Sequence, residues 1–122
     1  MLNALGSINL GSIFANGFLQ ASAGTTLSID DVSAESIELT APGIIETGNL
    51  IATTFIRAEG QGNITTGNLS AGIGVPTGAN GELNSINLRA LGSISAGSIF
   101  AASNLGVFAG GAITTGQATA YD

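Results

Sequence analysis

One short pattern returns six times along the chain, and it constrains the fold more than any other feature. The copies begin near residues 2, 19, 39, 56, 88 and 107, that is, at Leu2, Leu19, Leu39, Ile56, Leu88 and Val107. The clearest pair is LNALGSINLGSIFA from Leu2 and LRALGSISAGSIFA from Leu88, which differ at three of fourteen positions. A spacing of about 17 to 20 residues is typical of solenoids, whose units bury an apolar face only by stacking. The repeat therefore predicts a single solenoid domain over residues 1–122.

Apolar residues alternate within each copy, which is the period of a strand with one buried face. Leu39, Ala41, Gly43 and Ile45 illustrate this alternation, and helical spacing is not visible. We therefore predict an all-β fold, a parallel β-helix of about six coils with one longer insertion at 72–85.

Aligning the copies produces columns of like residues, which we expect to stack as ladders in the core. Two residues after the start of each copy there is an alanine, and further along there is an aliphatic residue. The alanine column contains Ala4, Ala21, Ala41, Ala58, Ala90 and Ala109. The aliphatic column contains Ile8, Leu27, Ile45, Ile64, Ile94 and Ile113. A last column contains Ala15, Ala34, Ala52, Ala71, Ala101 and Ala120. In this alignment the second and fourth copies need two extra residues before the aliphatic column.

A further column is predicted to form a tight turn of the coil. It contains Gly11, Asp30, Gly48, Gly67, Gly97 and Gly116. A turn that needs positive φ favours glycine, and aspartate tolerates this conformation better than most residues. We therefore expect positive φ at these positions.

Composition argues against several classes of function. The chain has no cysteine and no histidine, so the commonest general base and the commonest metal ligands are missing. Only Arg57 and Arg89 are basic in a chain of net charge −6, so the chain lacks the cluster of basic residues that binds nucleic acid. No run reaches the roughly 18 apolar residues of a membrane-spanning helix. We predict a protein that is not an enzyme, needs no cofactor, does not bind nucleic acid and does not insert into membranes.

The repeats resemble the shaft of filamentous haemagglutinin-like exoproteins, which are large secreted bacterial adhesins. The resemblance lies in GNLIA from Gly48, TTGNLSA from Thr65, LRALGSISAGSIFA from Leu88 and AITTGQATA from Ala112. It implies a right-handed parallel β-helix, a structural role, and an extracellular or bacterial cell-surface location.

Two departures from the repeat are candidate places for binding. Residues 72–85 are either an outward loop or an irregular extra coil. Five acidic residues within one short stretch could collect a calcium ion, but their spacing matches no calcium loop, and solvated outer-wall charges are the simpler interpretation. These residues are Asp30, Asp31, Glu35, Glu38 and Glu46. Arg57 and Arg89 each follow the first residue of a copy, so we expect them to point outward in one column.

Both ends of the expected rod are uncharged. No charged residue occurs from Met1 to Ile29 or from Ala90 to Tyr121. Because exposed sheet edges are ordinarily protected by charges, proline or a cap, we expect each end to meet another β-coil. That coil belongs either to a second copy stacked head to tail in a filament, or to neighbouring repeats of a longer adhesin shaft. The alternative function is a module that binds a glycan or a host surface through the outer wall or the 72–85 segment.

Overall fold

The computed structural model describes residues 2–72, 86–101 and 105–120, and over these residues the chain forms strands and no helix. Every strand pairing in this part of the chain is parallel. The strands are β1 (Leu2–Ala4), β2 (Ile8–Leu10), β3 (Ile13–Phe14), β4 (Phe18–Ala23), β5 (Leu27–Ile29), β6 (Val32–Ala41), β7 (Ile45–Thr47), β8 (Leu50–Gly60), β9 (Ile64–Thr65), β10 (Leu69–Ala71), β11 (Ile86–Ala90), β12 (Ile94–Ala96), β13 (Ile99–Ala101), β14 (Leu105–Ala109), β15 (Ile113–Thr115) and β16 (Ala118–Ala120). This arrangement is the predicted β-solenoid.

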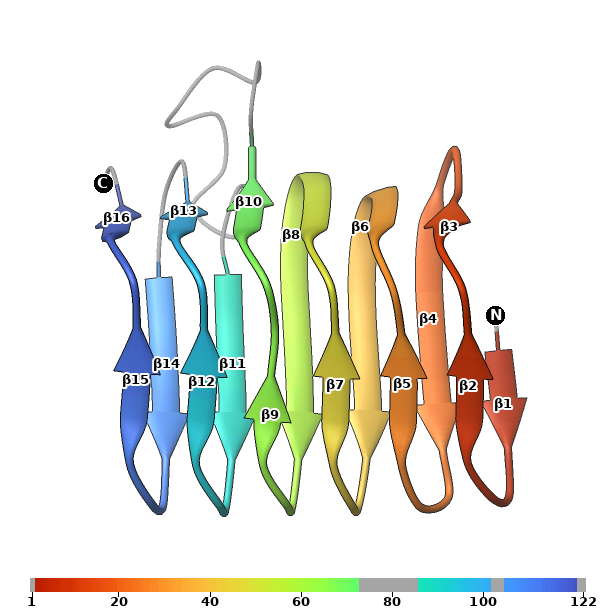
Figure 1. Ribbon diagram of the computed structural model, residues 1–122. Coiled ribbons are helices and arrows are strands. Elements are labelled where there is room, and N and C mark those ends of the chain that lie inside the picture. Colours follow the sequence, from red (N-terminus) through yellow and green to blue (C-terminus); the bar gives the residue numbers. More distant parts are fainter. Residues whose placement is uncertain (1, 73–85, 102–104, 121–122) are drawn as a thin grey trace.

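Successive coils lie side by side along the rod and present three faces (Figure 1). Face 1 contains β1, β4, β11, β14 and the C-terminal parts of β6 and β8. Face 2 is the six-stranded sheet of β2, β5, β7, β9, β12 and β15. Face 3 contains β3, β10, β13, β16 and the N-terminal parts of β6 and β8. The chain passes from face 1 to face 2 to face 3 in each coil, so equivalent residues stack in columns.

Strand register defines where each coil begins, and it corrects the predicted boundaries of two coils. On face 1 Leu2 lies beside Ala21, Leu39 beside Ala58, and Leu88 beside Val107. Coils 1 to 6 therefore begin at Leu2, Ala21, Leu39, Ala58, Leu88 and Val107. Coils 2 and 4 start two residues later than the predicted Leu19 and Ile56. With these starts, coils 2 and 4 no longer need two extra residues before the aliphatic column. The chain makes five full turns, and coil 6 follows to Ala120.

The spacing between stacked residues is regular except at one corner. Residues paired in the strand register of neighbouring coils are 18 or 19 positions apart, and 30 apart between coils 4 and 5. Faces 1, 2 and 3 all keep register across this longer step. The extra length is thus confined to the connection between Ala71 and Ile86. Apart from Gly72, the predicted insertion at 72–85 lies outside the described residues.

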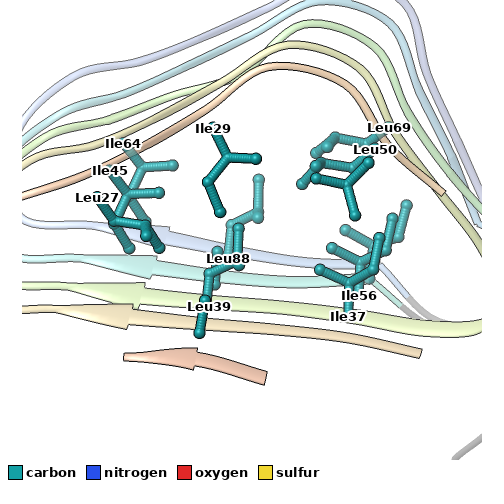
Figure 2. Close-up of a cluster of buried hydrophobic side chains, with 14 of the residues drawn as sticks. Leu27, Ile29, Ile37, Leu39, Ile45, Leu50, Ile56, Ile64, Leu69 and Leu88 are labelled. Carbon is teal, nitrogen blue, oxygen red and sulfur yellow. The ribbon is translucent and has the colours of Figure 1, made fainter. Parts of the chain in front are cut away.

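Stacked aliphatic side chains from the three faces fill the lumen (Figure 2). Leu27, Ile45 and Ile64 stack from face 2, and Leu50 and Leu69 from face 3. The face 1 columns supply the opposite wall, with Ile37 over Ile56 and Leu39 in the column of Leu88. All of these side chains are fully buried, so each coil contributes one layer of a continuous apolar core.

Candidate assembly surfaces

The predicted aliphatic column is aligned on face 2 by the register of all six strands. Ile8, Leu27, Ile45, Ile64, Ile94 and Ile113 are direct neighbours in that order. The four central members are at most 1% exposed, Ile8 is 8% exposed, and Ile113 is 48% exposed. The ladder thus reaches the outermost coils, and in coil 6 it is left partly uncovered.

The predicted alanine column is divided between two neighbouring columns of face 1. Ala4 lies beside Ala23, Ala41 beside Gly60, and Ala90 beside Ala109. Ala21 and Ala58 lie one column away, where they alternate with larger residues such as Leu39 and Leu88. This correction follows from the two-residue shift in coils 2 and 4. The last predicted column, from Ala34 to Ala120, is aligned in the register of face 3.

The predicted turn column stacks at the corner between faces 2 and 3, but positive φ is not the reason for its glycines. Gly67 donates its N–H to the carbonyl of Gly48 at 2.9 Å, and Gly97 donates to Gly67 at 3.0 Å. Among the described glycines only Gly72 has a positive φ, 84°. The expectation of positive φ in this column is therefore wrong.

Glycine is required in this column because a side-chain ladder passes over it. Asp31 Oδ1 accepts the N–H of Asn49 at 2.8 Å, and Asn49 Oδ1 accepts the N–H of Asn68 at 2.8 Å. Asn68 Oδ1 continues the ladder by accepting the N–H of Ser98 at 2.9 Å. A Cβ on Gly67 would stand 2.5 Å from Asn49 Oδ1, and Gly48 and Gly97 are in the same situation. Each Asx oxygen thus occupies the space that a side chain on the next coil would need.

A second glycine column, at the corner between faces 1 and 2, was not recognised from the sequence. Gly62, Gly92 and Gly111 lie two residues before the aliphatic column and donate to the coil before them. Asn63 Oδ1 accepts the N–H of Ser93 at 2.8 Å and lies 2.3 Å from the position of a Cβ on Gly92. The signal was available as a glycine at a constant offset from the aliphatic column.

Coil 1 carries glycines in both turn columns although the space that a side chain would take there is empty in the described structure. In coil 1, Gly6 and Gly11 are equivalent to Gly62 and Gly67 of coil 4. In coils 3 to 6 the equivalent Cβ positions meet the preceding coil at 3.3 Å or less. A Cβ on Gly6 or Gly11 would have no described heavy atom within 4 Å. Coil 1 therefore has glycine at the two positions where, in coils 3 to 6, the preceding coil leaves no room for a side chain.

Charged side chains are spread over different faces of the middle coils. Arg57 lies beside Glu38, 3.8 Å from its carboxylate, whereas Arg89 lies beside Glu59 in the next column and 5.9 Å from the ring of Phe108. The expectation that Arg57 and Arg89 share a column is therefore wrong, for the same reason as Ala58.

The five clustered acidic residues of the sequence do not converge in space. Asp30 and Asp31 lie at a turn, Glu35 at the corner between faces 3 and 1, Glu38 on face 1 and Glu46 on face 2. Within the described residues no three acidic, cysteine or histidine side chains form a group that could hold a metal ion.

One groove on the outer wall combines polar and apolar side chains. It has a volume of about 370 Å³ and lies where face 1 turns toward face 2. Thr40, Glu59, Arg89 and Leu91 line it together with Pro42. A guanidinium beside apolar surface is a group that can bind a carboxylate.

No helix of the described residues has the length and apolar character needed to cross a membrane. Comparisons with protein-family models, with curated proteins and with solved structures found no match for this chain.

Proposed function

We propose that this chain is a structural β-solenoid whose end coils are each covered by another β-coil, and that for the isolated chain this coil belongs to a second copy stacked head to tail. Such a contact joins two different surfaces and generates an open filament when it does not close into a ring. The resemblance to haemagglutinin-like repeats supports an extracellular or bacterial cell-surface location and a role as part of an adhesin shaft. The proposed role requires no active site.

The observation that carries the proposal is the pair of turn glycines in coil 1. Gly67 is required because Asn49 of the preceding coil lies against it, yet Gly11 has no such neighbour in the described structure. Where the backbone accepts a side chain, glycine costs about 0.4–1 kcal/mol relative to alanine, because it makes the unfolded chain more flexible. A neighbouring coil over Gly6 and Gly11 would give both residues the steric role that glycine has in the central coils.

The core ladders of the two end coils also match each other. If coil 6 of one copy precedes coil 1 of the next in the same register, Ile113 stacks on Ile8 and Val107 on Leu2. Ile113 is 48% exposed, and Leu2 and Val107 are only partly buried, so the joint would cover apolar surface. Like-charge repulsion does not oppose it, because no charged residue occurs from Met1 to Ile29 or from Ala90 to Tyr121.

Electron microscopy of the purified chain over a range of concentrations tests this proposal. We expect unbranched filaments that lengthen with concentration, and we expect Ile113→Lys to abolish them by placing a charge in the ladder at the joint. Thr114→Lys is the matched control, because Thr114 lies on the same strand in the outward column of face 2.

Persistent monomers of the unmodified chain would contradict head-to-tail stacking. Covalent repeats of a longer shaft would then be the remaining way to cover the end coils. Filaments of normal length from Ile113→Lys would show that the joint is not formed by the aliphatic ladder.

The second candidate function is a binding module for a glycan or a host surface. The groove beside Arg89 favours a ligand that carries a carboxylate, such as an acidic sugar. Binding of uronate-containing oligosaccharides, measured by calorimetry, should be lost in Arg89→Ala and kept in Arg57→Ala. Equal binding by both variants, or none by the unmodified chain, would argue against this groove.

A further inference from the structure

The outward-facing column in the middle of face 3 alternates large and small side chains from coil to coil. The register places six residues in it, one from each coil. In order from coil 1 to coil 6 they are Phe14, Ser33, Ile51, Ser70, Phe100 and Thr119. Phe14 is 79% exposed, Ile51 is 48% exposed and Phe100 is partly buried, so a large apolar residue occupies this column at every second coil, about 10 Å apart.

Hollows lie beside these large side chains, where the small residues are. One groove of about 390 Å³ is lined by Phe14, Ser33 and Ile51. Another, of about 380 Å³, is lined by Phe100 and Thr119. Face 3 therefore combines an alternating column of large and small side chains with one hollow over coils 1 to 3 and another over coils 4 to 6.

This alternating column is complementary to the same column of a second copy only when the axes of the two copies are antiparallel. When two copies place face 3 against face 3 with parallel axes, each coil meets its own number, so Phe14 meets Phe14 and Ser33 meets Ser33. With antiparallel axes and full overlap, coil 1 meets coil 6, coil 2 meets coil 5 and coil 3 meets coil 4. Each large residue then meets a small one, because an alternating column of six members is complementary to its own reverse. Close packing without voids favours this second arrangement.

The polar column at the edge of face 3 favours the same direction. Asp31 is the one charged residue of this column, which otherwise contains serine, asparagine and glutamine. In a face-to-face pair, parallel axes reverse the strand direction of the partner, so Asp31 at one edge of face 3 would lie opposite Glu35 at the other edge of the partner's coil 2, which is a like-charge pair. Antiparallel axes bring Asp31 opposite Ser98 and Asn49 opposite Asn68, so the charges are separated by several coils.

We propose that two copies of this chain pair laterally through face 3, with antiparallel axes and a two-fold axis between Ile51 and Ser70. The contact is isologous, so each interaction occurs twice. Ile51 of each copy lies against Ser70 of the other. Within the described residues the Ser70 hydroxyl is already buried in the single chain and makes no hydrogen bond, so this contact breaks none. This surface is separate from the end coils, and the pairing does not depend on head-to-tail stacking.

Single spin labels distinguish this pairing from the other arrangements, and the chain has no native cysteine. Thr53→Cys and Asn16→Cys place labels at equivalent exposed corners of coils 3 and 1. We would make both in an Ile113→Lys background, which suppresses head-to-tail stacking. Antiparallel pairing places the Thr53 labels about 5 Å apart along the axis and the Asn16 labels about 24 Å apart, from a strand spacing of about 4.8 Å.

The other arrangements give different distances. Parallel pairing gives both pairs of labels the same distance, with no separation along the axis, and head-to-tail stacking places both about 29 Å apart, six strand spacings. Either result, or a chain that shows no distances between molecules, would overturn the proposal.

A double-mutant cycle tests the contact itself. Ser70→Ile sets two isoleucines against each other, and Ile51→Ser leaves a void, so each should weaken pairing, the first by about tenfold. The double variant Ile51→Ser with Ser70→Ile restores a large residue opposite a small one and should pair within about twofold of the parent. Circular dichroism checks that all three fold, and sedimentation measures pairing. A double variant as weak as Ser70→Ile, or a Ser70→Ile variant that pairs normally, would contradict the assigned register.

Discussion

Ile64 and Ile113 occupy the same column of face 2, yet Ile64 is completely buried and Ile113 is 48% exposed. The two residues belong to coils of the same design, so the difference comes from their neighbours alone. A coil in the middle of the rod is covered on both sides, whereas coil 6 is covered on one. The comparison shows that a solenoid coil obtains its stability from the adjacent coils, as expected when each unit contacts only its neighbours.

The largest difference in unfolding free energy between a central coil and an end coil is expected for substitutions in the aliphatic column of face 2. Ile64→Ala should lower the free energy of unfolding by about 2–5 kcal/mol, because it leaves a cavity in a closed core. Ile113→Ala should lower it by less than about 1 kcal/mol, because this side chain is already half exposed. Urea denaturation followed by circular dichroism at low protein concentration measures both. Equal losses would mean that coil 6 is covered as completely as coil 4.

The turn glycines provide a second matched pair. Gly67→Ala should cost about 1–3 kcal/mol, since its Cβ would stand 2.5 Å from Asn49 Oδ1 and force the ladder to move. Gly11→Ala should leave the monomer as stable as before or raise its unfolding free energy by up to about 1 kcal/mol, because no described heavy atom lies within 4 Å of its Cβ position.

The second effect of Gly11→Ala should appear in assembly. A methyl group at this position would meet a coil stacked on coil 1, so filament growth should decrease while the monomer remains at least as stable to heat. Unaltered filament growth would show that no coil lies against Gly11 in the filament.

The side-chain ladder should contribute less than the core does. Asn68→Ala removes the acceptor for the Ser98 N–H, 2.9 Å away, and should cost about 0.5–1.5 kcal/mol in unfolding free energy. Asn87→Ala is the control, because Asn87 is exposed and has no side-chain hydrogen bond within the described residues. A similar loss in both variants would show that the ladder contributes nothing specific.

The smallest effect is expected on the outer wall. Arg57 is 58% exposed and lies 3.8 Å from Glu38, so solvent screens this pair, and Arg57→Ala should change the unfolding free energy by no more than about 0.5 kcal/mol. The change should shrink further in 1 M salt. A loss above about 1 kcal/mol that persists in high salt would indicate packing of the Arg57 stem rather than an ion pair.

Much of the fold could be predicted from the sequence because like residues stack on like. The aliphatic column from Ile8 to Ile113 and the alanine column from Ala34 to Ala120 are both aligned in the register. The right-handed winding that the family resemblance implies stays a prediction, as do the secreted location and the adhesin role.

The errors of the sequence alignment have a common physical origin. Ala21, Ala58 and Arg57 were all assigned to a column two residues away from their own. Side chains of a strand alternate with a period of two, so a shift of one residue turns the pattern inside out and is easily detected. A shift of two residues keeps every inward side chain inward. Alternation alone could not reject it.

The surface proposed for lateral pairing could be recognised only from the tertiary structure. Successive members of the face 3 column are 18, 19 or 30 positions apart, so its large members lie 37 and 49 positions apart. Phe14, Ile51 and Phe100 are not periodic in the sequence for this reason.

The sequence by itself determined that this chain forms a stack of β-coils, because its alternating apolar residues and constant glycines can bury an apolar face only by repetition. The tertiary structure decided which residues are neighbours, because register depends on contacts between coils that no single coil contains. It also decided why glycine recurs at the turns: the asparagine and aspartate oxygens of one coil occupy the space that a side chain on the next would need.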